Sequence, residues 1–378
     1  MTNQQKMIVG VVGVLIVVGL LEWGLTAQRA VPAAGEPIKI GVVASLTGPG
    51  SFYGQNIRKG VQLAVDEIHT AGGVNGNLLE AVFEDDVTDS KQVVSAVRKL
   101  ADVDNVVALI GPQWDFLSNA AIPIINERAL VAISPAAAYD SILEENRTSP
   151  FYFTTFPSAS AATDAVAKFL QREQAKTAVM IAANNDWGAA HLNAYQAAAA
   201  QSNVQIVETF RLAQLDNNDL RAELTRIKEL RPDAVLLVMN DADNIRFSKR
   251  YRELGLDSSV VAHSNIGDPL RTNRLDLQTA DQFYFFEYPA PDTSFSERFK
   301  EHYNEQPQIA ADTAYDAVSV IKQAIEQGDA TRQGIAKGIR QVRNFSGVTG
   351  PIDFTANNFP ERRALLKQVV NQQIIDVN

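Results

Sequence analysis

Short apolar runs alternate with longer amphipathic stretches along most of the chain. The first run, Ile38–Ala44, is rich in β-branched residues and predicts a strand. A stretch from about 54 to 70 carries apolar residues at helical spacing, and Ala71-Gly72-Gly73 ends it. The later run 106–110 is apolar throughout, which is typical of a strand buried on both faces of a parallel sheet. The alternation therefore predicts an α/β protein built from βαβ units.

The alternating series occurs twice. A stretch at 149–157, rich in Pro, Phe and Thr, lacks helical spacing, and a second α/β series begins after it. Roughly 340 residues follow the N-terminal segment, which is more than one hydrophobic core usually serves. We therefore expect two doubly wound, Rossmann-like lobes with parallel sheets, joined by a hinge of several crossing strands. The predicted boundaries are residues 37–155 plus about 288–345 for lobe 1, and residues 156–287 plus about 346–378 for lobe 2.

Residues 1–36 are predicted to be a signal peptide or a membrane anchor. A polar start with one Lys precedes an apolar run at residues 7–21, which Glu22 ends. This run is about 15 residues long, between a typical signal core and the length that spans a bilayer, so cleavage and retention both stay open. Val31-Pro32-Ala33 offers small residues for a peptidase. We expect a periplasmic or extracellular protein, secreted or tethered to the inner membrane by residues 7–21.

The composition of the chain excludes some kinds of membrane anchor and argues against some kinds of binding partner. The chain has no Cys, which excludes a lipoprotein anchor and disulfides, so stability must come from the core. Its net charge of −10 argues against nucleic acid and anionic membrane surfaces as partners. We expect a monomer that meets the membrane only through its N-terminal segment.

Enzymatic motifs are missing or wrongly spaced. Gly48-Pro49-Gly50 with Gly54 follows the first strand, but the third Gly comes one position too late for a dinucleotide loop. There is no Cys nucleophile and no G-x-S-x-G elbow. Asp85, Asp86 and Asp89 are expected to make caps and turn hydrogen bonds. The four histidines are scattered, so we expect no catalytic residue, metal or cofactor; they are His69, His191, His263 and His302.

Polar, aromatic and small residues recur at the predicted carboxyl ends of strands in both series. Such ends line the cleft between two α/β lobes, so the pattern predicts a small-molecule site, mostly apolar with a few directed polar groups. The candidate ligand-binding residues are Ser45, Thr47, Tyr53, Trp114, Asp115, Phe116, Ala136, Ala137, Ala138 and Tyr139 in the first series, and Trp187, Asn240, Asp241, Ser264 and Asn265 in the second.

Several short motifs resemble the Leu/Ile/Val-binding family, the type I periplasmic solute-binding proteins of ABC transporters. They include Leu46-Thr47-Gly48-Pro49, Ile110-Gly111-Pro112, the run 313–318 and the run 347–352. Each motif is weak alone, but their order and spacing extend over nearly the whole chain after residue 37. The resemblance implies hinge closure on an amino acid, amide or related compound, and its delivery to the permease subunits of an ABC transporter. A membrane-anchored sensory protein not coupled to transport is the alternative.

The predicted pocket departs from the family pattern. Asp115 stands where the family has a Ser that binds the ligand carboxylate, and Ala138 stands where it has a Thr. Ser264 or Asn265 falls at the position of the second-lobe acid. A carboxylate facing a ligand carboxylate at close range costs on the order of several kcal/mol. The resemblance therefore does not imply that the ligand is a plain α-amino acid bound in the family's usual orientation.

An alternative ligand chemistry follows from this departure. We hypothesise that Asp115 accepts hydrogen bonds from an ammonium, amide or other N–H donor, while Tyr53 and Trp187 pack on the apolar part of the ligand. A slip of one or two residues in the family match would instead place Asp115 outside the cleft.

Overall fold

The computed structural model describes residues 35–138, 140, 149–213, 218–354, 358–360 and 362–377. The predicted signal or anchor lies almost wholly outside these ranges. Within them, no helix combines the length and the apolar character needed to cross a bilayer.

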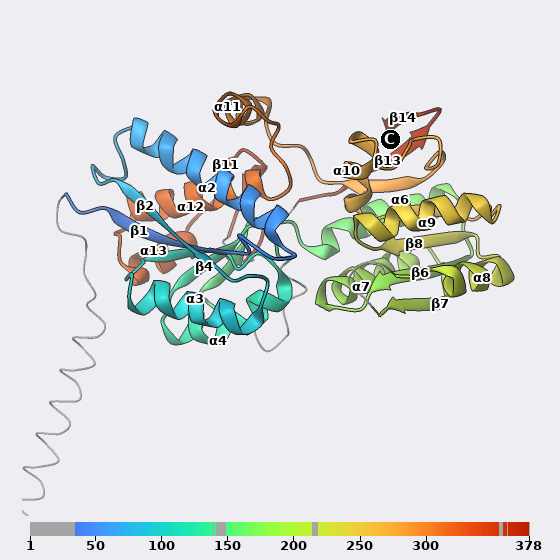
Figure 1. Cartoon of the computed structure of the whole chain (residues 1–378), viewed down its shortest axis with the longest axis horizontal. Coiled ribbons are helices and arrows are strands. Elements are labelled where there is room, and N and C mark those ends of the chain that lie inside the picture. The colour runs from blue at the N-terminus through green and yellow to red at the C-terminus, as the bar shows by residue number, and fades with distance from the viewer. Residues whose placement is uncertain are drawn as a thin grey trace, which may run out of the picture.

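Two open sheets organise the chain into two lobes that lie side by side (Figure 1). The first sheet is parallel throughout, in the order β2-β1-β3-β4-β5. It consists of β1 (Ile38–Ala44), β2 (Leu79–Asp85), β3 (Ala108–Ile110), β4 (Val131–Ser134) and β5 (Tyr152–Thr154). The predicted α/β class and two-lobed, parallel architecture are confirmed.

The second sheet repeats this order with β7-β6-β8-β9-β10 and adds two antiparallel strands, β13 and β14, at one edge. It consists of β6 (Thr177–Ala183), β7 (Gln205–Leu212), β8 (Ala234–Val238), β9 (Ser259–Ala262), β10 (Tyr284–Glu287), β13 (Leu365–Val370) and β14 (Gln373–Asp376). The first strand of each series is therefore inside its sheet, and the strand order reverses beside it.

Helices cover both faces of the first sheet. One face packs under α2, α12 and α13, and the other under α3 and α4. Helix α11 lies outside α2, and a short hairpin, β11-β12, packs beside α12. Their bounds are α2 (Ser51–Thr70), α3 (Ser90–Asp102), α4 (Asp115–Glu127), α11 (Thr293–Tyr303), α12 (Ala311–Gln327), α13 (Arg332–Ile339), β11 (Phe345–Gly347) and β12 (Gly350–Ile352).

The second sheet is covered in the same way. Helices α6 and α7 pack on one face, and α8, α9 and α10 pack on the other. Their bounds, with those of two 3-10 turns, are η2 (Ala159–Ala162), α6 (Thr163–Arg172), α7 (Asp186–Gln201), α8 (Arg221–Leu230), α9 (Asp241–Glu253), η3 (Ser264–Ile266) and α10 (Gly267–Arg271).

A glycine in the first turn of one helix of each lobe lets that helix approach the end of the preceding strand. A Cβ on Gly54 of α2 would lie 2.0 Å from the carbonyl oxygen of Ser45, and one on Gly188 of α7 would lie 1.9 Å from that of Ala183. Contacts this short are forbidden to any larger residue. The two glycines therefore fix how closely α2 and α7 approach the strand ends β1 and β6.

The chain crosses between the lobes three times, after β5, after β10 and before β13. Ile352 and Phe354 still belong to the first hydrophobic core, and the chain rejoins the second sheet at Leu365. The last crossing therefore lies later than the expected boundary near residue 346. The reason is that the hairpin β11-β12 packs on α12, although its sequence alone does not distinguish it from the strands that follow.

Candidate functional site

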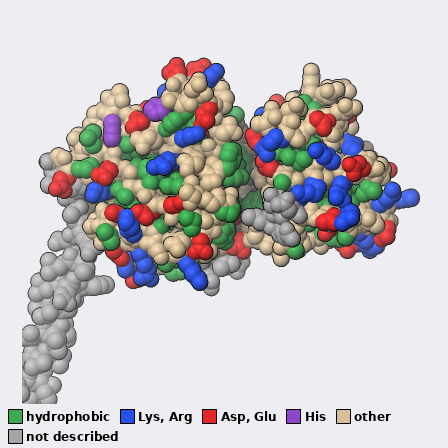
Figure 2. All heavy atoms as spheres, viewed as in Figure 1, with side chains coloured by type: hydrophobic (Ala, Val, Ile, Leu, Met, Phe, Trp, Pro, Cys, Tyr) green, Lys and Arg blue, Asp and Glu red, His purple; other side chains and the backbone are tan. Residues whose placement is uncertain are grey.

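The carboxyl ends of the two sheets face each other across the hinge. Asn119 of α4 donates a hydrogen bond through Nδ2 to Oδ2 of Asp186 at the start of α7, with a distance of 3.0 Å. Nearer the hinge, Ala138, Ala159 and Ala190 pack together from both sides. The space-filling view shows the lobes meeting at a narrow waist (Figure 2). In open α/β sheets this edge, beside the reversal of strand order, is where ligands bind.

The loop after β1 is held by carboxylates from the end of β2. Ser45 is fully buried, and its hydroxyl donates to Oδ1 of Asp86 at 2.5 Å. The hydroxyl of Thr47 donates to Oδ2 of Asp85 at 2.6 Å. Asp89 accepts from two backbone N–H groups at the start of α3, which confirms the predicted capping role of this acidic cluster. Two of the candidate hydroxyls, Ser45 and Thr47, therefore shape the first-lobe loop through bonds within that lobe.

Three aromatic side chains form a continuous row on the first lobe. The Tyr53 and Trp114 ring centroids lie 5.6 Å apart, edge to face, and those of Trp114 and Phe116 lie 6.1 Å apart. Phe116, at the end of this row, is 39% exposed. The structure thus brings these three sequence-predicted residues together.

The pKa of the Tyr53 phenol also depends on charges of the second lobe. Burial raises the pKa of its phenol, and the carboxylates of Asp241 and Asp268 raise this pKa further. Both carboxylates belong to the second lobe, where Arg274 pairs with Asp241 at 3.0 Å and also with Asp268. The phenol of the first lobe therefore lies within electrostatic range of these second-lobe carboxylates.

Asp115 is the first residue of α4 and is buried. A carboxylate at this position interacts favourably with the positive end of the helix dipole. The loop after β4 lies close by, where Ser134 Oγ accepts from the backbone N–H of Ala137 at 3.0 Å and donates to the carbonyl of Pro112 at 2.6 Å. The segment Ala136–Ala138 is thereby fixed, and Tyr139 lies outside the described residues.

The second-lobe candidates lie at the starts of helices. Asn240 caps α9 by accepting from the backbone N–H of Asp243 at 3.2 Å. Trp187, half-buried in the first turn of α7, packs against His191 and His263 with ring centroids 5.3 and 5.0 Å away. Ser264 and Asn265 form the turn η3 directly after His263.

Three features of this region were not predicted from the sequence. The histidines are scattered along the chain, yet Nε2 of His191 and Nε2 of His263 lie 3.1 Å apart, both buried. The second feature is the Asn119–Asp186 contact. The third is Arg362, buried in the last crossing segment beside Asp316.

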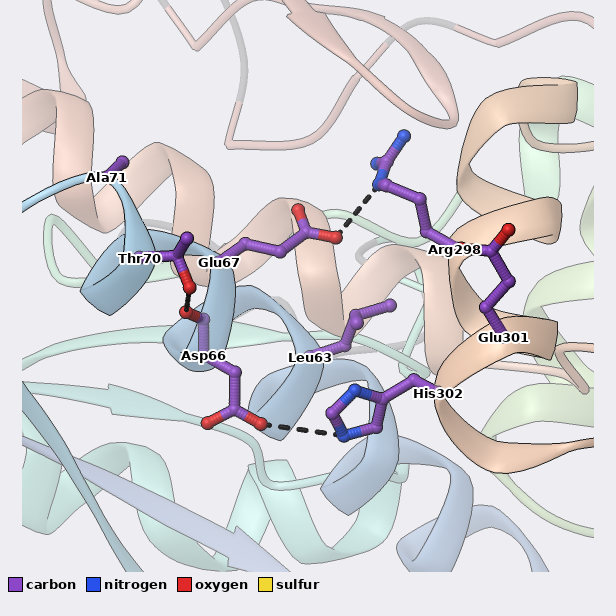
Figure 3. Close-up of a pocket in the computed structure, with 8 residues that line it drawn as sticks. All are labelled: Leu63, Asp66, Glu67, Thr70, Ala71, Arg298, Glu301 and His302. Carbon is purple, nitrogen blue, oxygen red and sulfur yellow. Dashed lines mark hydrogen bonds and ion pairs between the residues drawn. The ribbon is translucent and has the colours of Figure 1, made fainter.

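A separate pocket of about 600 Å³ lies on the first lobe between α2 and α11 (Figure 3). Four of its polar side chains form two pairs: Glu67 accepts from Arg298 at 2.8 Å, and Asp66 lies 3.5 Å from Nε2 of His302. None of the sequence-predicted site residues lines it. These side chains satisfy each other across the groove between α2 and α11. Because the predicted site residues lie elsewhere, we place the candidate site between the lobes.

The comparisons with known proteins agree with this architecture. The family model described as periplasmic binding protein matches residues 37–373. A leucine-, isoleucine-, valine-, threonine- and alanine-binding protein of Pseudomonas aeruginosa is 24% identical over 327 residues, covering 85% of this chain and 86% of that protein.

Solved structures show the same fold. The branched-chain amino acid transporter substrate-binding protein LivJ from Streptococcus pneumoniae, in complex with isoleucine, aligns with a TM-score of 0.76 at 24% identity, covering 89% of this chain and 97% of that one. An ABC-transporter solute-binding protein from R. palustris, in complex with benzoate, aligns with a TM-score of 0.77 at 18% identity, covering 90% and 96%. These matches confirm the type I periplasmic binding fold and the resemblance to Leu/Ile/Val-binding proteins. This chain belongs to the periplasmic binding protein family.

Proposed function

We propose that this protein captures a small molecule between its lobes by hinge closure and delivers it to the permease subunits of an ABC transporter. The observation that carries the proposal is the contact between the two strand-end edges, where Asn119 of the first lobe is bonded to Asp186 of the second. A ligand that contacts both edges stabilises the closed arrangement, because only that arrangement offers both sets of contacts. No covalent step is required.

The lining favours a ligand with a flat or apolar part and an N–H donor. Tyr53, Trp114 and Phe116 offer ring surfaces from the first lobe, and Trp187 offers one from the second. Asp115 adds a carboxylate at the start of α4. Amino acids, amides and related compounds fit this description. The structural neighbours were solved with isoleucine and with benzoate, which defines a useful range of test compounds.

Thermal-shift measurements against a panel test the proposal. The panel contains L-leucine, L-isoleucine, their amides, benzoate and 3,4-dihydroxybenzoate. A compound that binds the folded state at about 100 times its Kd stabilises it by about 2.7 kcal/mol, so the melting temperature rises by several degrees. The variant Trp187→Ala should lose most of that shift. A shift that is as large in Trp187→Ala as in the wild type places binding outside the cleft.

Delivery to a transporter is tested separately. We propose a periplasmic location, with residues 1–36 directing export or tethering the protein to the inner membrane. A strain lacking this protein should lose uptake of the compound found in the panel, and the full chain should restore it. Normal uptake in the deletion strain, together with lost signalling in response to the compound, would favour the sensory alternative.

A further inference from the structure

His191 of α7 and His263 at the end of β9 form a buried pair beneath Trp187. Their rings meet edge to face with centroids 4.5 Å apart, and their Nε2 atoms lie 3.1 Å apart. Only 1% of His191 and 3% of His263 is exposed. Trp187 covers both rings, and Phe286 of β10 packs on His263 at 4.9 Å. The pair thus lies directly under an aromatic side chain of the candidate cleft.

Backbone groups at the two ends of the pair fix where its ring hydrogens lie. The N–H of Asn265 can only donate, and it lies 3.3 Å from Nδ1 of His263, so this nitrogen accepts. The carbonyl of Trp187 can only accept, and it lies 3.0 Å from Nδ1 of His191, so that nitrogen carries a hydrogen. One hydrogen remains between the two Nε2 atoms, and it belongs to His263. Both imidazoles are therefore neutral.

A third ring proton costs this arrangement one of its hydrogen bonds. On Nε2 of His191, an added proton would oppose the N–H of His263 across 3.1 Å. If the His263 proton moved to Nδ1, Oγ of Ser264, 3.3 Å away, could accept it, but the proton would oppose the N–H of Asn265. In both cases one hydrogen bond of the chain breaks. Burial lowers the pKa of both imidazoles in the same sense, and for His263 the neighbouring His191 lowers it further.

The series of hydrogen bonds from the Trp187 carbonyl through His191 and His263 to the Asn265 N–H connects two separate parts of the candidate site. One end holds the first turn of α7, which carries Trp187, and the other holds the turn η3, which carries Ser264 and Asn265. We propose that the neutral His191–His263 pair positions the second-lobe half of the ligand site, and that its protonation displaces Trp187 and η3 and weakens ligand binding in acid. The ligand-binding part of this inference rests on the proposed function.

Other titratable groups near the pair modulate the effect. The charge of Asp140, in the loop after β4, favours the protonated form of His191. Asp186 belongs to the first turn of α7, where it is bonded to Asn119. Tyr195 of α7 and Tyr288 after β10 flank Phe286, and burial raises the pKa of both phenols, so they stay neutral in the range of interest.

Nitrogen NMR of the ligand-free full chain, with 15N-labelled histidine, tests the pair directly. At neutral pH we expect two neutral rings, His191 with hydrogen on Nδ1 and His263 with hydrogen on Nε2, assigned with His191→Phe and His263→Phe. On titration to about pH 5, protonation of the pair should begin only below the free-histidine value of about 6.5. A ring of opposite tautomer, or a pair that protonates at the free value, overturns the inference.

The positioning role has its own readouts in the same sample. The indole N–H signal of Trp187 and the backbone amide signal of Asn265 should shift together with protonation of the pair. His263→Phe should remove that coupling, and His302→Gln, on the distant helix α11, should keep it. Signals of Trp187 and Asn265 that stay fixed while the pair protonates contradict positioning.

The effect of protonation on ligand affinity is tested with L-leucine and benzoate as probes. The loss of one buried hydrogen bond predicts affinity about tenfold weaker once the pair is protonated, and a nearly flat profile in His263→Phe. If neither probe binds, the proposed function loses support while the ligand-free NMR still decides the pair. If a probe binds equally well in both protonation states of the wild type, the inference fails while the proposed function stands.

Discussion

Nδ2 of Asn119 lies 3.0 Å from Oδ2 of Asp186, and this hydrogen bond joins α4 of the first lobe to the first turn of α7 of the second. The two helices are also in contact at this point. The carboxyl edges of the two sheets are thus joined through these helices. Such a contact restrains the hinge, because opening must replace it with bonds to water.

Removal of this contact should let the lobes separate further. In Asn119→Ala, a charge-assisted hydrogen bond worth about 1–2 kcal/mol is lost at a partly exposed position. The ligand-free radius of gyration, measured by small-angle scattering, should rise above that of the wild type. Gln92→Ala, on the outer surface of α3, is the control and should scatter like the wild type. An Asn119→Ala profile that overlays the wild type would show that the contact does not restrain the hinge.

Asp115 allows a direct test of ligand chemistry. If its carboxylate accepts a hydrogen bond from an N–H group of the ligand, Asp115→Ala should weaken binding by about 1.5–3 kcal/mol, roughly tenfold to 150-fold. Isothermal titration with the compound selected by thermal shift measures this change. Asp104→Ala, on the surface beside Lys99, should bind as the wild type does. An unchanged affinity in Asp115→Ala removes this residue from the site.

Arg362 should anchor the last crossing segment to the first lobe. Its guanidinium donates to the hydroxyl of Thr349 and lies 3.9 Å from Oδ2 of Asp316. The same carboxylate accepts from the backbone N–H of Val348 through Oδ1 and from that of Thr349 through Oδ2. Arg362→Ala leaves that carboxylate buried without its cation, which costs roughly 3–5 kcal/mol.

Urea unfolding of Arg362→Ala measures this loss. The adjacent Arg363 is exposed, so Arg363→Ala should change the free energy of unfolding by no more than about 0.5 kcal/mol. Equal free energies of unfolding for Arg362→Ala and Arg363→Ala would mean that the buried ion pair does not stabilise the folded protein.

Stability should fall in acid because of the histidine pair. The folded state lowers the pKa of His191 and of His263 below the ordinary 6.5, so below about pH 6.5 the unfolded chain binds more protons than the folded one. The pair's contribution is therefore complete above this pH and is lost as pH falls through the lowered folded values.

Melting temperatures measured between about pH 7.5 and pH 5 check this sign. The double variant His191→Phe, His263→Phe should be less sensitive to pH than the wild type, since two aromatic rings remain and two protonation sites are gone. His302→Gln serves as the control and should keep the wild-type slope. A double variant with an undiminished slope would assign the acid sensitivity to other groups.

Local patterns predicted much of the scaffold. The strand Ile38–Ala44 has the bounds expected from its β-branched run, because a fully buried parallel strand leaves a continuous apolar signature. The cap at Asp89 was also predictable, since capping depends on neighbours two or three residues away. Helix α2 begins at Ser51 rather than near Gly54, because the turn before it already supplies the first helical hydrogen bonds.

The site was less predictable because its contacts are distant in sequence. His191 and His263 are separated by 72 positions, and they meet only because β9 lies two places from β6 in the sheet. The hydroxyls of Ser45 and Thr47 stand at a strand end, but the sequence does not reveal that the end of β2 supplies carboxylates to bind them. A residue pattern locates the edge of a sheet more readily than the direction of each side chain on it.

Small-angle scattering with and without ligand tests the central claim most directly. With a saturating concentration of the compound that gives the largest thermal shift, the radius of gyration should decrease as the lobes close. Trp187→Ala should require far more compound to reach the same decrease. A wild-type profile that does not change at saturation would contradict capture by hinge closure.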